Sequence, residues 1–351
     1  MADSGARVLV VRLSSLGDVA RLLPSLRSLS RAPGVAVADL TVEDRFASLL
    51  DLFPTGGRVI PYPRKAGGSP LRHPLRWSSA MRAYFSELRR SRYDLAIDLH
   101  GIFRSALVAR WSGARETAGY ARGFGREGSH LLYNRAVAPG DTPRLSRYAR
   151  YAGTLRALGF APPPEEYLEP NLPPAAREEA GGLLQGWGFA KAGYAFAFVG
   201  TSRAQAHKRW PLGHFAALAE RLHAACGLAT VIGWGPAEEG LVARLPSSPA
   251  LRVAPLLGMG TTLALIRGAR LFVGADTGFM HLSALMGVPT VAVMGPTDPV
   301  LNAPFGDRAR VVHREGIRRA CPGAGCDHRD CMGAVAPGEV LPAALGLLEA
   351  P

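Results

Sequence analysis

The segment GADTGFMHLSALMGVPTVAVMGPTDP, residues 274–299, constrains the fold of this chain more than any other stretch. It predicts a strand that ends at Val273, a turn through residues 276–278, a helix that carries His281, and a buried strand over residues 288–294. A strand, a tight turn and a helix in this order are the repeating unit of a doubly wound α/β domain. The free amide groups at the start of such a helix can bind an anion.

Two side chains capable of chemistry lie beside this turn, Asp276 and His281. A carboxylate and an imidazole next to a phosphate site suit transfer from a nucleotide sugar better than simple hydrolysis. The turn alone is equally compatible with a plain strand–helix unit in which Asp276 only caps the helix.

The length of 351 residues exceeds what one hydrophobic core usually serves, so two domains are expected. The stretch PPPEEYLEPNLPP, residues 162–174, is typical of a linker, and strand–helix patterns occur on both sides of it. We place the first domain at residues 1–165 and the second at residues 166–335. Residues 336–351 are expected to form a helix that packs back on the first domain.

Composition is that of a soluble globular protein, with 48% hydrophobic and 20% charged residues. The chain has no apolar run of about 18 residues, which a transmembrane helix would need. The opening MADSGARVLVVRL has an acidic residue and only a short apolar run, unlike a secretory signal. We therefore expect a cytoplasmic enzyme.

The net charge of +13 is unevenly distributed. Residues 58–110 hold eleven Lys and Arg against three acidic residues, a net charge of +8. This surface suits an acidic substrate, an anionic membrane face or nucleic acid, although it can also be a solvated Arg-rich surface. Nucleic acid is the weaker option, because no binding motif with interleaved aromatic residues is found.

Three cysteines, Cys321, Cys326 and Cys331, form a C-x4-C-x4-C pattern with His328 among them. Zinc ligands usually come in C-x2-C pairs, so the spacing is a weak metal signal. Reduced structural thiols are the favoured interpretation, and metal binding stays an open alternative. A disulfide is not expected in the cytoplasm.

The loop 14–18 follows a predicted strand over residues 8–12 and ends at Asp18, the start of a helix, where the dipole stabilises a carboxylate. Asp18 either caps this helix or takes a proton from an acceptor hydroxyl. A second loop, residues 200–211, combines hydroxyl side chains with cations, as a phosphate site does. Its Lys208 could neutralise a diphosphate leaving group, and the alternative is a solvated basic loop.

Two weaker candidates are Glu238 and Met259. Glu238 follows the predicted strand over residues 229–232 and could accept hydrogen bonds from a ribose or sugar, although a Glu is more often a surface residue. Met259 could pack on a flat base, although a lone Met is more often part of a core.

Together these loops resemble glycosyltransferase family 9, the lipopolysaccharide heptosyltransferases. The segments VLVVRLSSLGDVARLLPSL, HKRWP, GWGPAEE and GADTGFMHLSALMGVPTVAVMGPTDP are similar to the family's motifs in order and spacing. YDLAIDLHGIFRSALVARW, with GREGSHLLYNRAV downstream, is most similar to heptosyltransferase I, which adds the first heptose to the Kdo sugars of the inner core.

The resemblance implies a GT-B fold, in which two Rossmann-like doubly wound domains face a central cleft. The N-terminal domain is then expected to bind the acceptor and the C-terminal domain the donor, ADP-L-glycero-D-manno-heptose, with no obligatory cofactor and no metal. Transfer is expected to be an inverting displacement at the anomeric carbon. The implied acceptor is the Kdo region of the lipopolysaccharide inner core. The protein is expected to reach it as a monomer, peripherally attached to the anionic inner-membrane surface.

Residue roles follow from the matching motifs. The resemblance implies that Asp18 is the base and that Lys208 assists catalysis. Residues implied for the donor site are Thr201, Ser202, Lys208, Glu238, Met259, Asp276, Thr277, Gly278 and His281. Residues implied for the acceptor site are Arg64, Lys65, Arg72, Arg76 and Arg104.

Two departures from the family pattern lie on the acceptor side. After Gly17-Asp18-Val19 the chain reads Ala20-Arg21, where heptosyltransferase I commonly has a His, and the insert AGGSPLRHP, residues 66–74, is atypical. Three alternatives stay open: heptosyltransferase II, another family 9 transferase with a different sugar or acceptor, and a non-catalytic nucleotide-sugar-binding protein.

Overall fold

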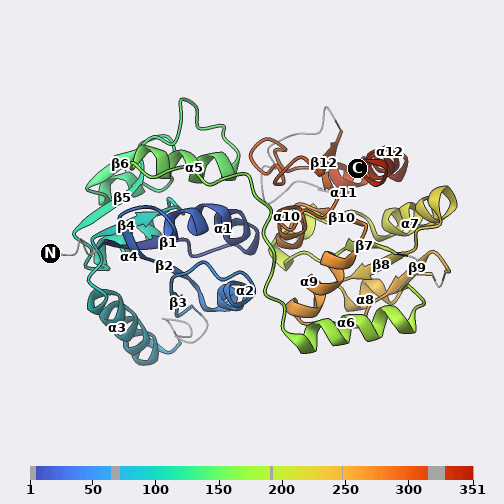
Figure 1. Ribbon diagram of the computed structural model, residues 1–351, viewed down its shortest axis with the longest axis horizontal. Coiled ribbons are helices and arrows are strands. Elements are labelled where there is room, and N and C mark those ends of the chain that lie inside the picture. The colour runs from blue at the N-terminus through green and yellow to red at the C-terminus, as the bar shows by residue number, and fades with distance from the viewer. Residues whose placement is uncertain (1–4, 65–71, 190–192, 247, 315–328, 351) are drawn as a thin grey trace. The chain divides into compact units, whose positions relative to one another are not determined.

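The computed structural model describes residues 5–64, 72–189, 193–246, 248–314 and 329–350 (Figure 1). Contacts within the chain divide it into two compact units, Met1–Glu166 and Tyr167–Pro351. Each unit contains one six-stranded sheet whose neighbouring strands are all parallel. The α/β architecture predicted from the sequence is confirmed in both units.

The N-terminal unit has the strand order β3-β2-β1-β4-β5-β6. Its strands are β1 (Ala6–Val11), β2 (Val35–Glu43), β3 (Val59–Tyr62), β4 (Leu95–Asp98), β5 (Glu116–Tyr120) and β6 (Arg135–Val137). Its helices are α1 (Leu16–Ser30), α2 (Ala47–Leu52), α3 (Pro74–Arg90), α4 (Phe103–Trp111) and α5 (Arg147–Ala157), with 3-10 turns η1 (Asp44–Phe46) and η2 (Ser129–Leu132).

Helix α1 illustrates how the sequence determines the packing of this unit. Its apolar side chains recur at helical spacing and are buried, namely Val19, Leu22, Leu23, Leu26 and Leu29. Strand β1 is an apolar run that is buried on both faces, as expected for a central parallel strand. Helices α1 and α5 pack against each other within this unit (Figure 1).

The C-terminal unit has the strand order β12-β11-β10-β7-β8-β9. Its strands are β7 (Ala195–Phe198), β8 (Thr230–Gly233), β9 (Leu251–Val253), β10 (Leu271–Ala275), β11 (Thr290–Met294) and β12 (Ala309–His313). Its helices are α6 (Pro174–Gly186), α7 (Leu212–Cys226), α8 (Glu239–Val242), α9 (Met259–Gly268), α10 (Gly278–Leu285), α11 (Arg329–Gly333) and α12 (Pro337–Glu349), with the 3-10 segment η3 (Arg203–Lys208).

Helix α12 belongs to the core of the C-terminal unit. It packs on α7 and on β11 and β12, and its buried residues Val340, Ala344 and Leu347 join the apolar cluster of that unit. The apolar face of α12 is thus covered by the helix and strands of its own unit.

None of the helices in the described ranges is both long enough and apolar enough to cross a bilayer.

Each sheet contains a point at which the strand order reverses. In the N-terminal unit β1 lies beside β4, and in the C-terminal unit β7 lies beside β10. In doubly wound sheets, ligands bind at the carboxyl ends of the two strands that flank this point. Asp18 and Arg104 lie in the first turns of the helices that follow β1 and β4, and Thr201 and Asp276 lie in the loops after β7 and β10. The topology therefore collects the predicted site residues of each unit at one edge of its sheet.

Candidate functional site

Asp18 lies in the first turn of α1 and is surrounded by arginines. One carboxylate oxygen, Oδ2, lies 2.5 Å from Nη2 of Arg12, and Oδ1 lies 2.8 Å from Nη2 of Arg21. A third arginine, Arg147 of α5, has its Nε 3.9 Å from Oδ1. Ser15 also donates to Oδ2, from its amide at 3.3 Å and from its hydroxyl at 3.2 Å. Both oxygens of Asp18 are thus engaged.

The arginines determine the charge state of Asp18. Burial alone would raise the pKa of this carboxyl, but attraction to Arg12, and then to Arg21 and Arg147, holds the pKa far below its ordinary value. For Arg12, burial would lower the pKa, and the nearby Asp18 carboxylate raises it instead. The pair is therefore ionised at any physiological pH.

Asp98, at the end of β4, connects two segments of the N-terminal unit. Its Oδ2 accepts hydrogen bonds of 2.7 Å from the Ser105 hydroxyl and 2.7 Å from the Tyr133 hydroxyl. Its Oδ1 accepts from the amides of His100, at 2.8 Å, and Gly101, at 3.1 Å. These contacts join the segments IDLHGIFRS and GREGSHLLYN, the two that most resemble heptosyltransferase I.

His100 is the side chain that this arrangement holds beside the Asp18 region. Arg12, which pairs with Asp18, also donates from Nη1 to the carbonyl of Leu99 at 2.9 Å and to that of His100 at 3.5 Å. Burial and the positive charge of Arg12 lower the pKa of His100 to about 2. His100 is therefore a neutral imidazole, and the sequence alone did not single it out.

Two predicted acceptor residues converge on a buried acid, Glu43, at the end of β2. The Glu43 side chain is 0% exposed, and its Oε1 lies 2.7 Å from Nη1 of Arg64 and 3.2 Å from Nη2 of Arg104. Arg45 pairs with the other oxygen at 2.8 Å. Arg64 and Arg104 thus lie together in the folded unit, although 40 positions separate them in sequence numbering.

The other predicted acceptor residues are less constrained. Arg72 and Arg76 are exposed, near and within the first turn of α3. Lys65 and most of the insert 66–74 lie outside the residues that the structure describes.

In the C-terminal unit, Lys208 and Asp276 form an ion pair. Nζ of Lys208 lies 2.7 Å from Oδ2 of Asp276, and the second carboxylate oxygen lies 3.3 Å from Nε2 of His281. His281 is buried in α10, whose N-cap is Thr277. Asp276 is therefore not simply the cap of this helix, which was the alternative interpretation of the sequence. The loop after β7 and the turn after β10 meet through Lys208 and Asp276.

Glu238 is fully buried and is an internal partner of the neighbouring loop. It forms an ion pair with Arg209, whose guanidinium also donates to the Thr201 hydroxyl at 3.1 Å. The amides of Thr201, at 3.4 Å, and Gly235, at 3.3 Å, point to the two oxygens of Glu238. A Cβ added to Gly200 would lie 3.0 Å from the Gly235 nitrogen, so these loops need a glycine to approach this closely.

The remaining donor-site candidates lie around the same edge. Ser202 is exposed at the N-cap of η3, and Gly278 opens α10. Met259 is half-buried at the start of α9.

The cysteine pattern is only partly covered. Cys321, Cys326 and His328 lie outside the described residues, whereas Cys331 is a half-buried free thiol. Within the described ranges, no group of three or more His, Cys, Asp or Glu is arranged to hold a metal ion.

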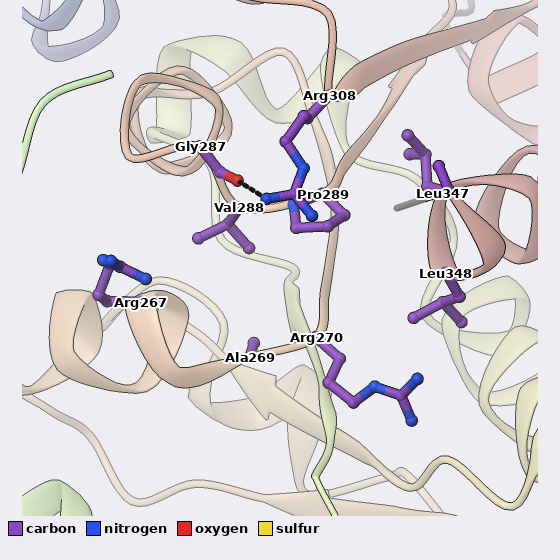
Figure 2. Close-up of a pocket in the computed structure, with 10 residues that line it drawn as sticks. Arg267, Ala269, Arg270, Gly287, Val288, Pro289, Arg308, Leu347 and Leu348 are labelled. Atoms are coloured by element: carbon purple, nitrogen blue, oxygen red, sulfur yellow. Dashed lines mark hydrogen bonds between the residues drawn. The ribbon is translucent and has the colours of Figure 1, made fainter. Parts of the chain in front are cut away.

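A separate hollow of about 250 Å³ lies at the amino ends of β10 and β11 (Figure 2). Arg267, Arg270 and Arg308 border it, and Arg308 donates to the Gly287 carbonyl at 3.3 Å. Helices α9 and α12 end beside it, and the C-terminal ends of helices attract cations. None of the predicted site residues lines this hollow.

Comparison with known proteins supplies the family. The model of the family described as glycosyltransferase family 9 (heptosyltransferase) matches residues 81–328, more than half of the chain. The chain belongs to glycosyltransferase family 9. It is therefore a glycosyltransferase, as the resemblance of its motifs predicted.

The relatives include enzymes of two types. Lipopolysaccharide heptosyltransferase 1 of Pseudomonas aeruginosa is 34% identical over 311 residues, which cover 86% of this chain and 81% of that protein. The enzyme of the same name from Escherichia coli K12 is 30% identical over 335 residues, covering 87% and 92%. Lipopolysaccharide heptosyltransferase 2 of Salmonella typhimurium is 27% identical over 317 residues, covering 87% of each. The chain is thus most similar to type 1.

Solved structures agree with this assignment. The structure described as E. coli heptosyltransferase WaaC with ADP has a TM-score of 0.74 and 27% identity, covering 97% of this chain and 99% of that one. The same enzyme with ADP-2-deoxy-2-fluoro heptose has a TM-score of 0.70 and 26% identity, covering 95% and 97%. The expected GT-B fold is confirmed.

Proposed function

We propose that this protein transfers heptose from ADP-L-glycero-D-manno-heptose to the Kdo region of the lipopolysaccharide inner core, with inversion at the anomeric carbon. The observation that carries the proposal is the Lys208–Asp276 pair, with His281 behind it, at the carboxyl end of β10. The similarity to a heptosyltransferase that was solved with ADP supports the same assignment.

The donor would bind to the C-terminal unit. Lys208 would neutralise the diphosphate, and the free amides at the start of α10, at Thr277 and Gly278, would hold a phosphate. Thr201 and Ser202 would add hydroxyl donors from the loop after β7. Met259 would pack against the base. Glu238 would contribute by holding the Thr201 loop through Arg209.

The acceptor would bind to the N-terminal unit. Arg64 and Arg104 around Glu43, with Lys65, Arg72 and Arg76, would contact its phosphates and carboxylates. The same positive surface would attach the protein, as a monomer, to the anionic inner face of the membrane from the cytoplasm. Because such attachment is electrostatic, it would weaken as salt is added.

In the transfer step, Asp18 would take the proton of the acceptor hydroxyl while that oxygen bonds to the anomeric carbon. The bond from the anomeric carbon to the diphosphate oxygen would break, and its electron pair would leave with ADP. Lys208 would stabilise the charge that develops on the diphosphate. A single displacement of this kind inverts the anomeric centre.

The proposal is tested by ADP release from purified protein given ADP-heptose and deacylated Kdo2-lipid A. We expect ADP release that depends on the acceptor, and a product heavier by one heptose. Nuclear magnetic resonance of the product would report the inverted linkage. Binding of ADP without transfer to either this acceptor or a heptosylated one would favour the non-catalytic alternative.

Heptosyltransferase II is the second candidate, because one of its members is 27% identical over 87% of this chain. This alternative predicts transfer to an acceptor that already carries the first heptose, and no transfer to the Kdo-terminated acceptor. Competition among several nucleotide sugars in the same assay would identify the donor.

A further inference from the structure

The surroundings of Asp18 conflict with what a base requires. A general base needs an oxygen that can accept the substrate's proton, and a pKa near the working pH gives the best catalysis. In this structure both oxygens of Asp18 are engaged by cations and by Ser15. Attraction to Arg12 and its neighbours outweighs burial and keeps the pKa of Asp18 far below its usual range. An aspartate in this state accepts a proton poorly.

The three arginines around Asp18 are not equivalent. Arg12 and Arg21 have side chains only 5% and 6% exposed, and each is also held by main-chain carbonyls, Leu99 for Arg12 and Gly17 for Arg21. Arg147 is 30% exposed and makes the longest of the three contacts, at 3.9 Å. Its buried Nε has no hydrogen-bond partner in the part of the chain that the structure describes. Arg147 is thus the cation most able to move to a ligand.

We propose that Arg147 is a specificity-determining residue. When the acceptor arrives, the Arg147 side chain moves away from Asp18 and binds an anionic group of the acceptor. Asp18 is then free to take the proton. This inference rests on the proposed function, since it assumes that Asp18 is the base. The group recognised is a carboxylate or phosphate located close to the accepting hydroxyl. An acceptor without that group would leave Asp18 paired with all three arginines.

Two electrostatic effects act in the same direction. Moving Arg147 to the ligand removes one attraction that stabilises the Asp18 carboxylate. The ligand's negative charge, brought close to Asp18, also disfavours that carboxylate. Both changes increase the proton affinity of Asp18 only while the correct acceptor is bound.

The other charged and titratable groups around Asp18 are less able to respond to acceptor binding. Arg12 reaches it from the end of β1, Arg21 from α1, and Arg147 from α5. Tyr151 of α5 lies under the Arg12 guanidinium, whose carbon is 5.8 Å from the ring centre. His100 is close but neutral, because burial and Arg12 lower its pKa. Arg147 is therefore the group whose movement changes the charge next to Asp18 at the least structural cost.

The proton balance of the step is unchanged. The hydroxyl proton moves to an Asp18 oxygen as the new C–O bond forms, and the electron pair of the broken bond leaves with ADP. Asp18 returns the proton to water after the product leaves.

The test compares two acceptors, deacylated Kdo2-lipid A and the same molecule with its sugar carboxylates converted to amides. We expect wild-type protein to prefer the charged acceptor in kcat/KM, and Arg147→Gln to reduce that preference about tenfold, as loss of one charged hydrogen bond would. Arg147→Lys should restore part of it. Arg156→Gln, an exposed arginine of the same helix, is the matched control and should keep the wild-type preference.

The outcomes separate the two proposals. If wild-type protein transfers to neither acceptor, the proposed function fails. If it transfers but Arg147→Gln keeps the wild-type preference, or loses activity equally with both acceptors, the role of Arg147 is refuted. Circular dichroism and ADP affinity of each variant show whether the fold and donor site are intact.

Discussion

The ammonium group of Lys208 lies 2.7 Å from the carboxylate of Asp276, and the two residues come from different strand-end loops, 68 positions apart. Neither side chain is fully exposed, so the pair forms where water only partly screens it. A diphosphate that arrives at this point would compete with Asp276 for Lys208. The pair therefore keeps the cation positioned before the donor binds.

Replacing Lys208 with Ala should raise the KM for ADP-heptose and slow transfer about a hundredfold, because the developing charge on the diphosphate loses its nearest cation. Steady-state kinetics with the Kdo acceptor would measure both changes. Arg203→Ala, an exposed cation of the same loop, is the matched control and should have little effect. Unchanged kinetics in Lys208→Ala would remove this lysine from the mechanism.

Asp18→Asn should abolish transfer and leave ADP affinity nearly intact, since ADP is proposed to bind in the other unit. It should also destabilise the protein by about 3 kcal/mol, because the buried Arg12 and Arg21 lose their shared partner. Asp51→Asn, an exposed carboxylate of the same unit, is the control. An equal loss of ADP affinity would indicate a purely structural role for Asp18.

The stability effect of Asp18 should depend on pH in a defined direction. Its pKa in the folded state is depressed below the ordinary 3.8, so the ionised group stabilises the fold at neutral pH. Below about pH 4 the unfolded chain binds a proton that the folded chain does not, and this contribution is progressively lost. The difference in the free energy of unfolding between wild type and Asp18→Asn, measured with urea, should therefore become smaller as pH falls below about 4. A difference that stays constant with pH would contradict a stabilising role of the Asp18 ion pairs.

Reversing the charge at Arg76 and at Arg64 should have different effects on protein stability. Arg76→Glu changes an exposed side chain, so it should raise the KM for the acceptor without changing stability. Arg64→Glu places a second carboxylate beside the buried Glu43 and should lower the unfolding midpoint as well. Acceptor kinetics together with thermal unfolding distinguish the two. Equal stability of both variants would show that the Glu43 cluster does not need Arg64.

Arg209→Met should weaken ADP binding about tenfold, because the buried Glu238 would lose its cation and the Thr201 loop would loosen. Arg209→Lys keeps the charge and should retain most of the affinity. Calorimetric titration with ADP would measure both. If Arg209→Met binds ADP like the wild type, Glu238 and its arginine do not position the donor loop.

The sequence predicted the strands and helices that frame the site well. The helix expected to carry His281 is α10, and the strand expected over residues 288–294 overlaps β11 from Thr290. These elements combine strong apolar periodicity with Gly or polar boundaries, so local physics decides them. The alternation of strands and helices also predicts parallel sheets, whereas the strand orders come from the structure.

What the sequence could not predict is the pairing of charges. Nothing local indicates that Arg12 reaches the Leu99 carbonyl across 87 positions, or that Arg64 and Arg104 share Glu43. In a chain with 41 Lys and Arg, many cations could serve each acid, and only the fold selects among them. The same limitation applies to Glu238, whose partner Arg209 is simply the next cation along from Lys208.

The indole of Trp210 donates to the carbonyl of Val335 at 2.8 Å, across 125 positions of sequence. Trp210 is only two residues beyond Lys208, and Val335 comes just before α12. This hydrogen bond therefore links the segment before α12 to the loop that would hold the diphosphate. A truncation or fusion that displaces α12 would therefore weaken nucleotide binding together with the core of the C-terminal unit.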